Sequence, residues 1–385
     1  MTDKPETRSQ VTSWLSLENV TSIPVRYLLG IAFFIGLALL PFQLGILDIL
    51  QMTAAFYFVM FVISWDFLSG YTGQVSFGHT LFFAAGGYTT TILNIEYGLD
   101  PVLGILLGVF VAGLAGFLLG VPGLRLEGHY LALFTLLPPL ILLRIFKLRR
   151  DIFGGVKGLP NAEPLLDAGS FAAAAESHYY LSLALLMFIF GLAWVITRSD
   201  TGTIFTAIKE SEDAVQSAGI NPNKFKLYAF TLSAMMGGLA GAVFVHTPAG
   251  SASPTQLLEL VVMIEILLAS ILGGFGTITG GLVGGFIIYW GMDWFEQLDW
   301  MVPVLEIPAT RIDMLLFFGL LLVVLMFLSD GLLPWALRQG RRGLSVVRGG
   351  DAAVTDGGPS TLNRQLEKFK HAMFDRNDED ERRKR

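Results

Sequence analysis

The stretch SDTGTIFTAIKESEDAVQSAGINPNKFKLYAF, residues 199–230, is a charged segment that leads directly into the apolar run TLSAMMGGLAGAVFVHTPAG, residues 231–250. Its ionisable side chains include Lys209, Glu210, Glu212, Asp213, Lys224 and Lys226. An unpaired ion at the centre of a bilayer costs at least about 2.5 kcal/mol. Because its surroundings are strongly apolar, we predict that residues 199–226 form a loop in water between two membrane spans.

Small side chains recur within this loop at three- and four-residue spacing, at Ala207, Ser211, Ala214 and Ala218. That spacing places them on one face of a helix, where another surface can approach the backbone closely. We predict a helix over 207–218, ended by Gly219 in left-handed geometry and prevented from restarting at once by Asn221-Pro222. An ordinary amphipathic surface helix would show a similar pattern, so that alternative stays open.

The composition is that of an integral membrane protein. The chain is 53% hydrophobic and only 15% charged, whereas soluble domains carry about 25% charged residues. It contains no cysteine, which excludes disulfides, thiolate metal sites and cysteine nucleophiles. The net charge of −6 gives no argument for a nucleic-acid partner.

Runs of the length needed to cross a bilayer, about 17 to 25 apolar residues, predict an all-α protein with about ten transmembrane helices. The ranges are 27–47, 50–68, 71–93, 101–121, 129–146, 180–197, 227–247, 256–274, 276–292 and 312–329. The third range opens on Gly73, Gln74, Ser76, Gly78 and His79. We predict that 71–93 is broken or re-entrant, since irregular backbone at membrane depth must face protein or a watery cavity.

The spans define three expected regions: an N-terminal tail (1–26), a transmembrane domain (27–335) and a flexible charged tail (336–385). Within the last region, Leu362, Leu366, Phe369 and Met373 would share one helical face, which could contact lipid headgroups or a partner. Lysine and arginine in short loops favour the cytoplasmic side. Placing the 199–226 loop and the arginines near 340 on that side makes both tails cytoplasmic.

One loop departs from this charge rule. Residues 147–179 fall on the outer side although Lys147, Arg149, Arg150 and Lys157 stand at their start. Three explanations stay open: the basic cluster 144–157 docks an acidic partner, it pairs with Asp151, or one span is miscounted.

Glycine spacing indicates how the helices pack. Glycines recur every fourth residue, among them the pair Gly237 and Gly241 and the set Gly276, Gly280 and Gly284. Small residues at this interval let helix backbones pack closely in lipid. This matters because the hydrophobic effect does not drive helices to associate there. We assign these five to helix packing.

No catalytic or metal-binding pattern stands out, since the chain has neither a Walker A sequence nor an HExxH motif. We therefore predict a protein that is not an enzyme and that holds no cofactor or metal. Polar groups inside spans are functional candidates, and we assign a translocation path to Tyr71, Gln74, Ser76, His79 and Glu265. His79 could equally form a packing hydrogen bond between helices. Asp66, at a span end, is expected at the membrane interface.

Five stretches resemble one known family. They are GYTGQVSFGHTLFFAAGGYTT (70–90), VPGLRLEGHYLALFTL (121–136), FGGVKGLPN (153–161), AIKESEDAVQSAGINPNKFKLYAFTLSAMMGGLAGAV (207–243) and ILGGFGTITGGLVGG (271–285). In order and spacing they are similar to the motifs of permease subunits of ABC importers for branched-chain amino acids, the LivM-type members in particular. The likeness runs from about Gly30 to Pro334.

The resemblance implies a permease in the cell membrane that pairs with a second homologous permease, two ATPase subunits and an extracytoplasmic solute-binding protein. ATP and Mg²⁺ would be bound by the partner ATPase. The residues implied to couple to it are Ala207, Glu210, Ser211, Asp213, Ala214, Ala218 and Gly219. The spans would rock around a central path in an alternating-access cycle.

Some positions depart from the family pattern. Asp66 stands where Asn is usual, Phe153 replaces a Thr, Pro138-Pro139 interrupts a span, and Ser329-Asp330-Gly331 replaces Pro-Gln-Gly. Urea and short-chain amide importers are similar in the same motifs and form the alternative for the solute. Two other classes are an ion-driven secondary carrier with Glu265 as its proton site, and an intramembrane enzyme, which nothing in the sequence supports.

Overall fold

The computed structural model describes residues 25–126, 128–159, 162–166, 168–296, 301–302, 307–308, 313–328, 331–336 and 338–339. The chain divides into two units, Met1–Trp335 and Ala336–Arg385. The predicted N-terminal tail up to residue 24 lies outside the described residues. So does nearly all of the predicted C-terminal tail, with its proposed helical face.

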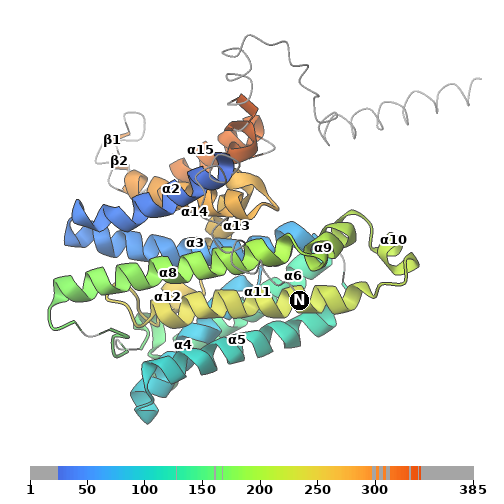
Figure 1. Cartoon of the computed structure of the whole chain (residues 1–385). Coiled ribbons are helices and arrows are strands. Elements are labelled where there is room, and N and C mark those ends of the chain that lie inside the picture. Colours follow the sequence, from blue (N-terminus) through green and yellow to red (C-terminus); the bar gives the residue numbers. More distant parts are fainter. Residues whose placement is uncertain are drawn as a thin grey trace, which may run out of the picture. The chain divides into compact units, whose positions relative to one another are not determined.

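Helices dominate the described chain (Figure 1). In order, the elements are α2 (Val25–Leu39), η2 (Leu40–Phe42), α3 (Ile46–Thr72), α4 (His79–Tyr97), α5 (Pro101–Gly123), α6 (His129–Leu148), α7 (Arg150–Phe153), η3 (Gly155–Lys157), α8 (Phe171–Thr197), α9 (Asp200–Glu210), α10 (Glu212–Ser217), α11 (Pro222–Phe244), α12 (Pro254–Leu257), α13 (Leu260–Gly274), α14 (Ile278–Glu296), β1 (Met301–Val302), β2 (Ile307–Pro308) and α15 (Asp313–Phe327). The two strands, β1 and β2, pair antiparallel.

Six described helical ranges are long and apolar enough to cross a membrane: α3, α5, α6, α8, α11 and the range Pro254–Gly274, which contains α12 and α13. Shorter apolar helical ranges cover Leu28–Phe42 and Met314–Met326. The prediction of an all-helical, multi-pass membrane protein is confirmed at this level. Each of the ten predicted ranges overlaps a helix. The third range includes the non-helical residues 73–78, so the predicted irregular backbone is present, but it connects the end of α3 to the start of α4.

Helix α3 is the centre of the core. Every side chain from Val59 to Gly70 is buried, so this part of α3 has no face left for lipid or water, as expected of a helix that is apolar all round. It packs against α8, α11, α13 and α14, and its last turns meet α9. Most of the other helices are therefore positioned by their contact with α3.

Contacts along the helices fix their directions. Ser64 and Tyr57 of α3 meet Ser233 and Phe244 of α11, so these two helices are antiparallel. Helix α3 ends and α11 begins beside α9 and α10, at what we call the α9 end of the bundle (Figure 1). Helix α11 finishes at the opposite end.

Small residues let α4, α5 and α11 approach one another closely. A Cβ atom added at Gly241 would collide with the carbonyl oxygen of Phe83, and one added at Gly108 would lie 2.8 Å from the carbonyl oxygen of Gly86. Gly237 faces α3, with its added Cβ 3.2 Å from Ser64 Oγ. Helix pairs in lipid are held by van der Waals packing of this kind.

Helices α13 and α14 form a second close pair. A Cβ at Gly284 would collide with the carbonyl oxygen of Ala269, and one at Gly280 would lie 2.6 Å from the carbonyl oxygen of Gly274. On its other side α14 touches α3, since a Cβ at Gly285 would lie 2.9 Å from Val59 Cγ2. The α13–α14 pair thus packs against one side of α3.

Two local predictions about proline are wrong. Helix α6 continues through Pro138 and Pro139, which were expected to interrupt it. Helix α11 restarts directly at Pro222, because Asn221 caps it by accepting a hydrogen bond from the Asn223 backbone N–H (3.1 Å). Proline is favourable at the first position of a helix, where its missing N–H has no intrahelical partner anyway.

We predict that Gly241→Ala destabilises the protein by about 1–3 kcal/mol, the usual cost of overpacking, because its methyl group would meet the α4 backbone. Gly191→Ala is the matched control, since Gly191 is also helical but nothing lies within 4 Å of an added Cβ. The measurement is thermal unfolding of the purified chain in detergent. Equal unfolding temperatures for the two variants would contradict the packing.

Candidate functional site

The predicted coupling loop contains two short helices in place of one. Helix α9 ends at Glu210, and Ser211 is extended, with φ −161° and ψ 106°, before α10 begins. The Ser211 hydroxyl accepts a hydrogen bond from the Ala214 backbone N–H (3.3 Å), which caps α10. The prediction of one continuous helix over 207–218 is therefore wrong, because serine stabilises a helix start better than a helix interior.

All seven predicted coupling residues are exposed: Ala207, Glu210, Ser211, Asp213, Ala214, Ala218 and Gly219. Gly219 follows α10 with a φ of +82°, the left-handed geometry expected there. The opposite side of the two helices is turned into the bundle through Phe205, Ile208 and Val215. The structure thus presents a small-residue surface that the described part of the chain leaves uncovered.

Two lysines tie α9 and α10 to the bundle. The Lys226 ammonium, which belongs to α11, pairs with the Glu212 carboxylate at the start of α10, and Lys226 is only 5% exposed. The Lys209 ammonium, near the end of α9, donates a hydrogen bond to the carbonyl oxygen of Gly70 (2.8 Å). The two contacts lie on either side of Ser211.

Asp66 is fully buried at the same end of the bundle, so its carboxylate faces protein; its position at the membrane interface stays a prediction. Its Oδ1 atom accepts hydrogen bonds from Ser270 Oγ of α13 (2.5 Å) and from the Gly276 backbone N–H (2.9 Å). The Asp66 carboxylate therefore fixes the turn between α13 and α14 to α3. An asparagine carbonyl could accept the same two bonds.

The interrupted segment, residues 73–78, obtains its hydrogen bonds from side chains. Ser76 accepts from Trp65 Nε1 at its carbonyl (2.7 Å) and donates its backbone N–H to Ser69 Oγ (3.3 Å). The Phe77 backbone N–H donates to Thr135 Oγ1 of α6 (3.0 Å). This backbone faces protein, which is the condition for irregular structure at membrane depth.

His79 opens α4 and is completely buried. Its Nε2 atom lies 2.6 Å from Ser233 Oγ, and that hydroxyl donates to the carbonyl oxygen of Ser64 (2.6 Å). Since the hydroxyl has one proton, Nε2 must be the donor to it. His79 thereby links α4, α11 and α3, and its Nδ1 has no partner among the described residues.

The other predicted path residues occupy different places. Gln74 lies in the interrupted segment, buried, and its Oε1 has no partner in the described part of the chain. Tyr71 is near the end of α3, where its hydroxyl accepts from the Ile278 backbone N–H (3.4 Å). Glu265 is half-buried on α13, next to the buried Ile266. Gln74, Ser76 and His79 thus lie close together in the structure, as they do in the sequence, whereas Glu265 lies on another helix, α13.

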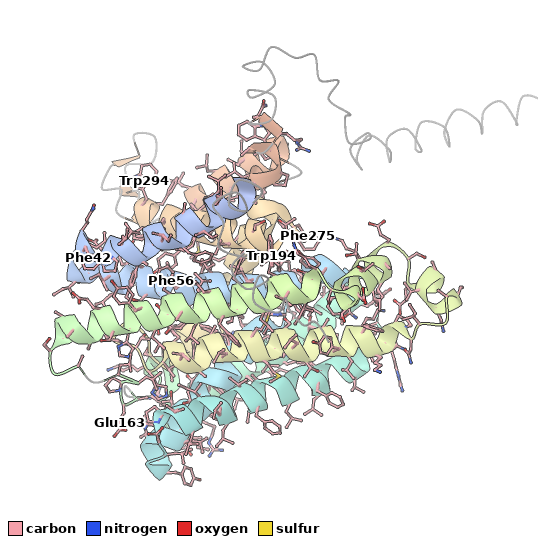
Figure 2. All side chains as sticks on the ribbon, viewed as in Figure 1. Phe42, Phe56, Glu163, Trp194, Phe275 and Trp294 are labelled. Carbon is pink, nitrogen blue, oxygen red and sulfur yellow. The ribbon has the colours of Figure 1, made fainter. Side chains whose placement is uncertain are left out.

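A second polar group holds the opposite end of the bundle. His246, just beyond α11, donates from Nδ1 to the carbonyl oxygen of Glu163 (2.6 Å) and accepts at Nε2 from Thr90 Oγ1 (2.8 Å). Burial lowers the pKa of His246, which favours this neutral form. Asn94 Oδ1 in turn accepts from the Glu163 backbone N–H (2.9 Å). In Figure 2, the labelled residues Glu163 and Phe275 lie toward opposite ends of the helix bundle.

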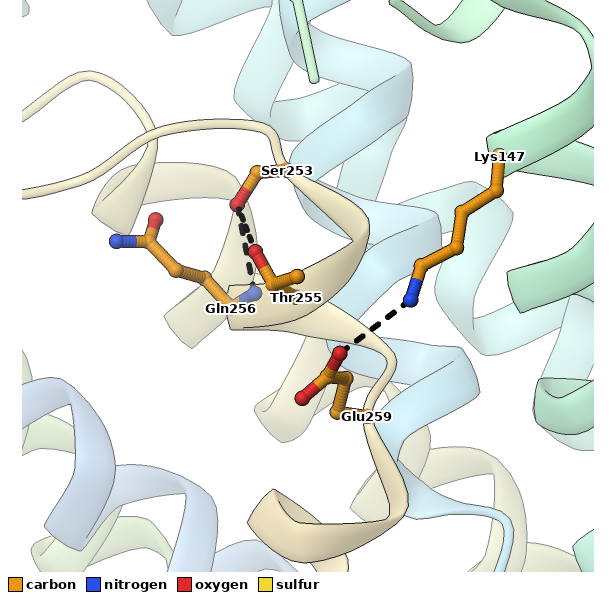
Figure 3. A network of polar contacts seen from close by, with 5 residues as sticks. All are labelled: Lys147, Ser253, Thr255, Gln256 and Glu259. Atoms are coloured by element: carbon orange, nitrogen blue, oxygen red, sulfur yellow. Dashed lines mark hydrogen bonds and ion pairs between the residues drawn. The ribbon is translucent and has the colours of Figure 1, made fainter. Parts of the chain in front are cut away.

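The basic residues that broke the charge rule are partly paired within the chain. Lys147 Nζ lies 3.4 Å from Glu259 Oε1, as Figure 3 shows beside the Ser253 cap of α12. Arg149 Nη2 lies 2.7 Å from Asp151 Oδ2, and this hydrogen bond holds the pKa of Asp151 below its usual range. The sequence interpretation that Asp151 pairs within the cluster matches this contact.

Across the described residues, no group of three or more His, Cys, Asp or Glu side chains could hold a metal ion. The three polar centres, at the α9 end, at the interrupted segment and around His246 at the opposite end, are built from hydrogen bonds between helices and from helix ends.

The described residues thus form a bundle of helices long and apolar enough to cross a membrane, with the buried non-helical segment 73–78 between α3 and α4 and with the exposed helices α9 and α10 at one end. Residues 46–325 match the family model described as the permease component of the branched-chain amino acid transport system. The chain belongs to this family.

Named relatives are similar over most of the chain. The high-affinity branched-chain amino acid transport system permease protein LivM of Escherichia coli (strain K12) is 27% identical, covering 78% of this chain and 73% of LivM. The autoinducer 2 import system permease protein LsrC of Salmonella paratyphi B (strain ATCC BAA-1250 / SPB7) is 30% identical over 68% of this chain and 78% of LsrC. No solved structure matches the chain.

Sequence reasoning missed several residues that build these centres, namely Ser64, Lys209, Ser233 and Ser270. Lys209 was recognised as a charge, yet its partner Gly70 is 139 positions away in the chain. Serines in apolar helices read as ordinary small residues. Only the pairing of distant helices reveals which of them carry a hydrogen bond.

We predict that Ser233→Ala lowers stability by about 1–3 kcal/mol, the cost of leaving a buried polar group unpaired, because His79 Nε2–H would lose its acceptor. Ser182→Ala is the matched control, since Ser182 is equally buried but donates only within its own helix, to Tyr179 (2.8 Å). Thermal unfolding in detergent measures both. A larger loss in the control would contradict the interhelical role of Ser233.

Proposed function

We propose that this chain is the membrane-spanning permease subunit of an ABC importer that moves branched-chain or other hydrophobic amino acids into the cell. The supporting observation concerns the two consecutive short helices α9 and α10, residues 200–217, which we call the α9–α10 hairpin. Its seven predicted coupling residues are exposed, while the same helices are bonded to the bundle through Lys209 and Glu212. A surface whose outer side is exposed and whose inner side is bonded to the bundle suits a docking site for an ATPase.

The translocation path runs, in this proposal, beside the interrupted segment. Gln74, Ser76 and His79 present polar atoms within the bundle, and two of these atoms, Gln74 Oε1 and His79 Nδ1, have no partner among the described residues. Broken helices of transporters expose polar groups to cargo in this way. Tyr71 and Glu265 complete the proposed path, on α3 and α13.

The topology that we propose has ten spans, formed by α2, α3, α4, α5, α6, α8, α11, α13, α14 and α15. The α9 end would face the cytoplasm, with both termini, because the exposed basic residue Lys224 lies there and lysines favour that side. The opposite end, with Lys147 and Arg149, would face the solute-binding protein.

The proposed assembly contains a second homologous permease, two ATPase subunits and an extracytoplasmic solute-binding protein, all in the cell membrane or at its surfaces. ATP and Mg²⁺ would be bound by the ATPase subunits. Coupling would run through Ala207, Glu210, Ser211, Asp213, Ala214, Ala218 and Gly219. Gly237, Gly241, Gly276, Gly280 and Gly284 would keep the moving helices in close contact.

The cargo rests on the named relatives. LivM is named for high-affinity branched-chain amino acid transport, which supports leucine, isoleucine and valine. LsrC is named for autoinducer 2 import, and its similar identity makes autoinducer 2 the second candidate cargo.

The experiment begins with purification of the chain from its native membrane in mild detergent. We expect a second permease and an ATPase to copurify, and the reconstituted complex with its binding protein to take up labelled leucine only when ATP is supplied. Labelled autoinducer 2 is measured in parallel. A chain that purifies alone, while other complexes stay intact in the same detergent, would contradict the proposal.

We predict that Ala214→Trp lowers the apparent affinity for the ATPase at least about tenfold, equivalent to 1.4 kcal/mol, because a bulky side chain would fill the exposed small-residue surface. Thr203→Trp is the control, since Thr203 is exposed on α9 outside the predicted coupling residues. Titration of the purified permease with its ATPase measures both. Equal affinities would show that the ATPase binds elsewhere.

A further inference from the structure

The Lys209 ammonium group lies where three elements meet. It donates to the carbonyl oxygen of Gly70 in the last turns of α3 (2.8 Å), and it lies 4.8 Å from the centroid of the Phe275 ring. A cation at this distance from an aromatic ring is attracted to its face. A Cβ added at Gly276 would lie 3.2 Å from Lys209 Nζ. One side chain of α9 therefore touches both α3 and the α13–α14 turn.

Asp66 holds the same turn from the other side. Its Oδ1 accepts from the Gly276 backbone N–H and from Ser270, while Lys209 approaches Gly276 directly. The Asp66 side chain and the Lys209 ammonium thus both approach Gly276, Asp66 through a hydrogen bond to its backbone N–H and Lys209 from the side where a Cβ would project. The turn is hydrogen-bonded to α3 through Asp66 and is in contact with α9 through the Lys209 ammonium and the Phe275 ring.

The backbones at this point are too close to move separately. A Cβ at Gly70 would lie 2.7 Å from Gly276 Cα, and Gly276 has a φ of +76°, so neither position accepts a larger residue without strain. The Tyr71 hydroxyl adds a bond to Ile278 at the start of α14 (3.4 Å). A displacement of Lys209 would therefore pull on α3 and on the α13–α14 turn together.

Lys209 is also close to the uncovered hairpin. It precedes the extended residue Ser211 by two positions, and α10 begins directly after Ser211. The start of α10 is held to α11 by the Glu212–Lys226 pair. Movement of α10 can therefore be transmitted to the bundle through two contacts. One is the Glu212–Lys226 pair with α11, and the other is the contact of Lys209 with α3.

We propose that Lys209 is a positioning residue that transmits movement of the α9–α10 hairpin to the end of α3 and to the α13–α14 turn. This inference rests on the proposed function, because it takes the hairpin to be the place where an ATPase acts. The Lys209 ammonium group connects the driven element to the helix that organises the core.

A purely static role has a different outcome. A cation at the C-terminal end of a helix stabilises it through the helix dipole, so a lysine that serves α3 only in this way would affect unfolding and leave the link between ATP hydrolysis and transport intact. The ratio of solute taken up to ATP hydrolysed separates the two roles.

The test uses the complete complex in lipid vesicles, with labelled leucine, or autoinducer 2 where that is the cargo found. We expect Lys209→Met to retain its ATPase subunits and to lower the ratio of uptake to ATP hydrolysis roughly tenfold, within the usual range of coupling between sites. Lys209→Arg, which keeps the charge and the donors, should restore most of it. Lys224→Met is the matched control, since Lys224 is exposed at the start of α11.

Two results would overturn the inference. One is a Lys209→Met complex whose ratio equals that of Lys224→Met. The other is a Lys209→Met complex that loses its ATPase subunits, because Lys209 would then serve assembly. Failure of the wild-type complex to take up solute with ATP would overturn the proposed function and this inference together, whereas a failure confined to Lys209→Met concerns the inference alone.

Discussion

Inside a bilayer, a backbone N–H or carbonyl that leaves a helix must find its partner within the protein. The interrupted segment 73–78 meets this requirement through Trp65, Ser69 and Thr135, which come from α3 and α6. Where α3 supplies these partners it is buried on every face. Helices α8, α11 and α14 pack around α3 and produce this burial. The polar core and the helical arrangement therefore depend on each other.

Glycine gives this arrangement its close contacts, and polar side chains give it specific pairs. Gly241 against Phe83 and Gly284 against Ala269 bring backbones together without a hydrophobic drive. His79 with Ser233, and Asp66 with Ser270, then fix which helices are neighbours. A packed bundle with a few buried hydrogen bonds can have discrete alternative arrangements, which is what alternating access needs.

The two ends of the bundle differ in construction. At the α9 end, charged groups bind an exposed hairpin to buried helix ends through Lys209 and Lys226. At the opposite end, His246 and Asn94 bind loops to α4, and the half-buried Lys147 and the exposed Arg149 are paired with neighbouring acids. Charged side chains thus hold helix ends together at one end, and a buried histidine and asparagine hold loops at the other.

Local sequence determined the class of protein and the location of its helices, because apolar length, glycine spacing and a charged loop act within a short stretch of chain. It also located the break at 73–78 and the left-handed Gly219. Helix ends were less certain, since Ser211 and Pro222 start helices where a continuous helix or a stop was expected. The burial of Asp66 and the partners of Lys209, His79 and Ser233 were decided only by the tertiary structure. Their hydrogen bonds join residues that are far apart along the chain, and nothing in the local pattern encodes which distant helix will be adjacent.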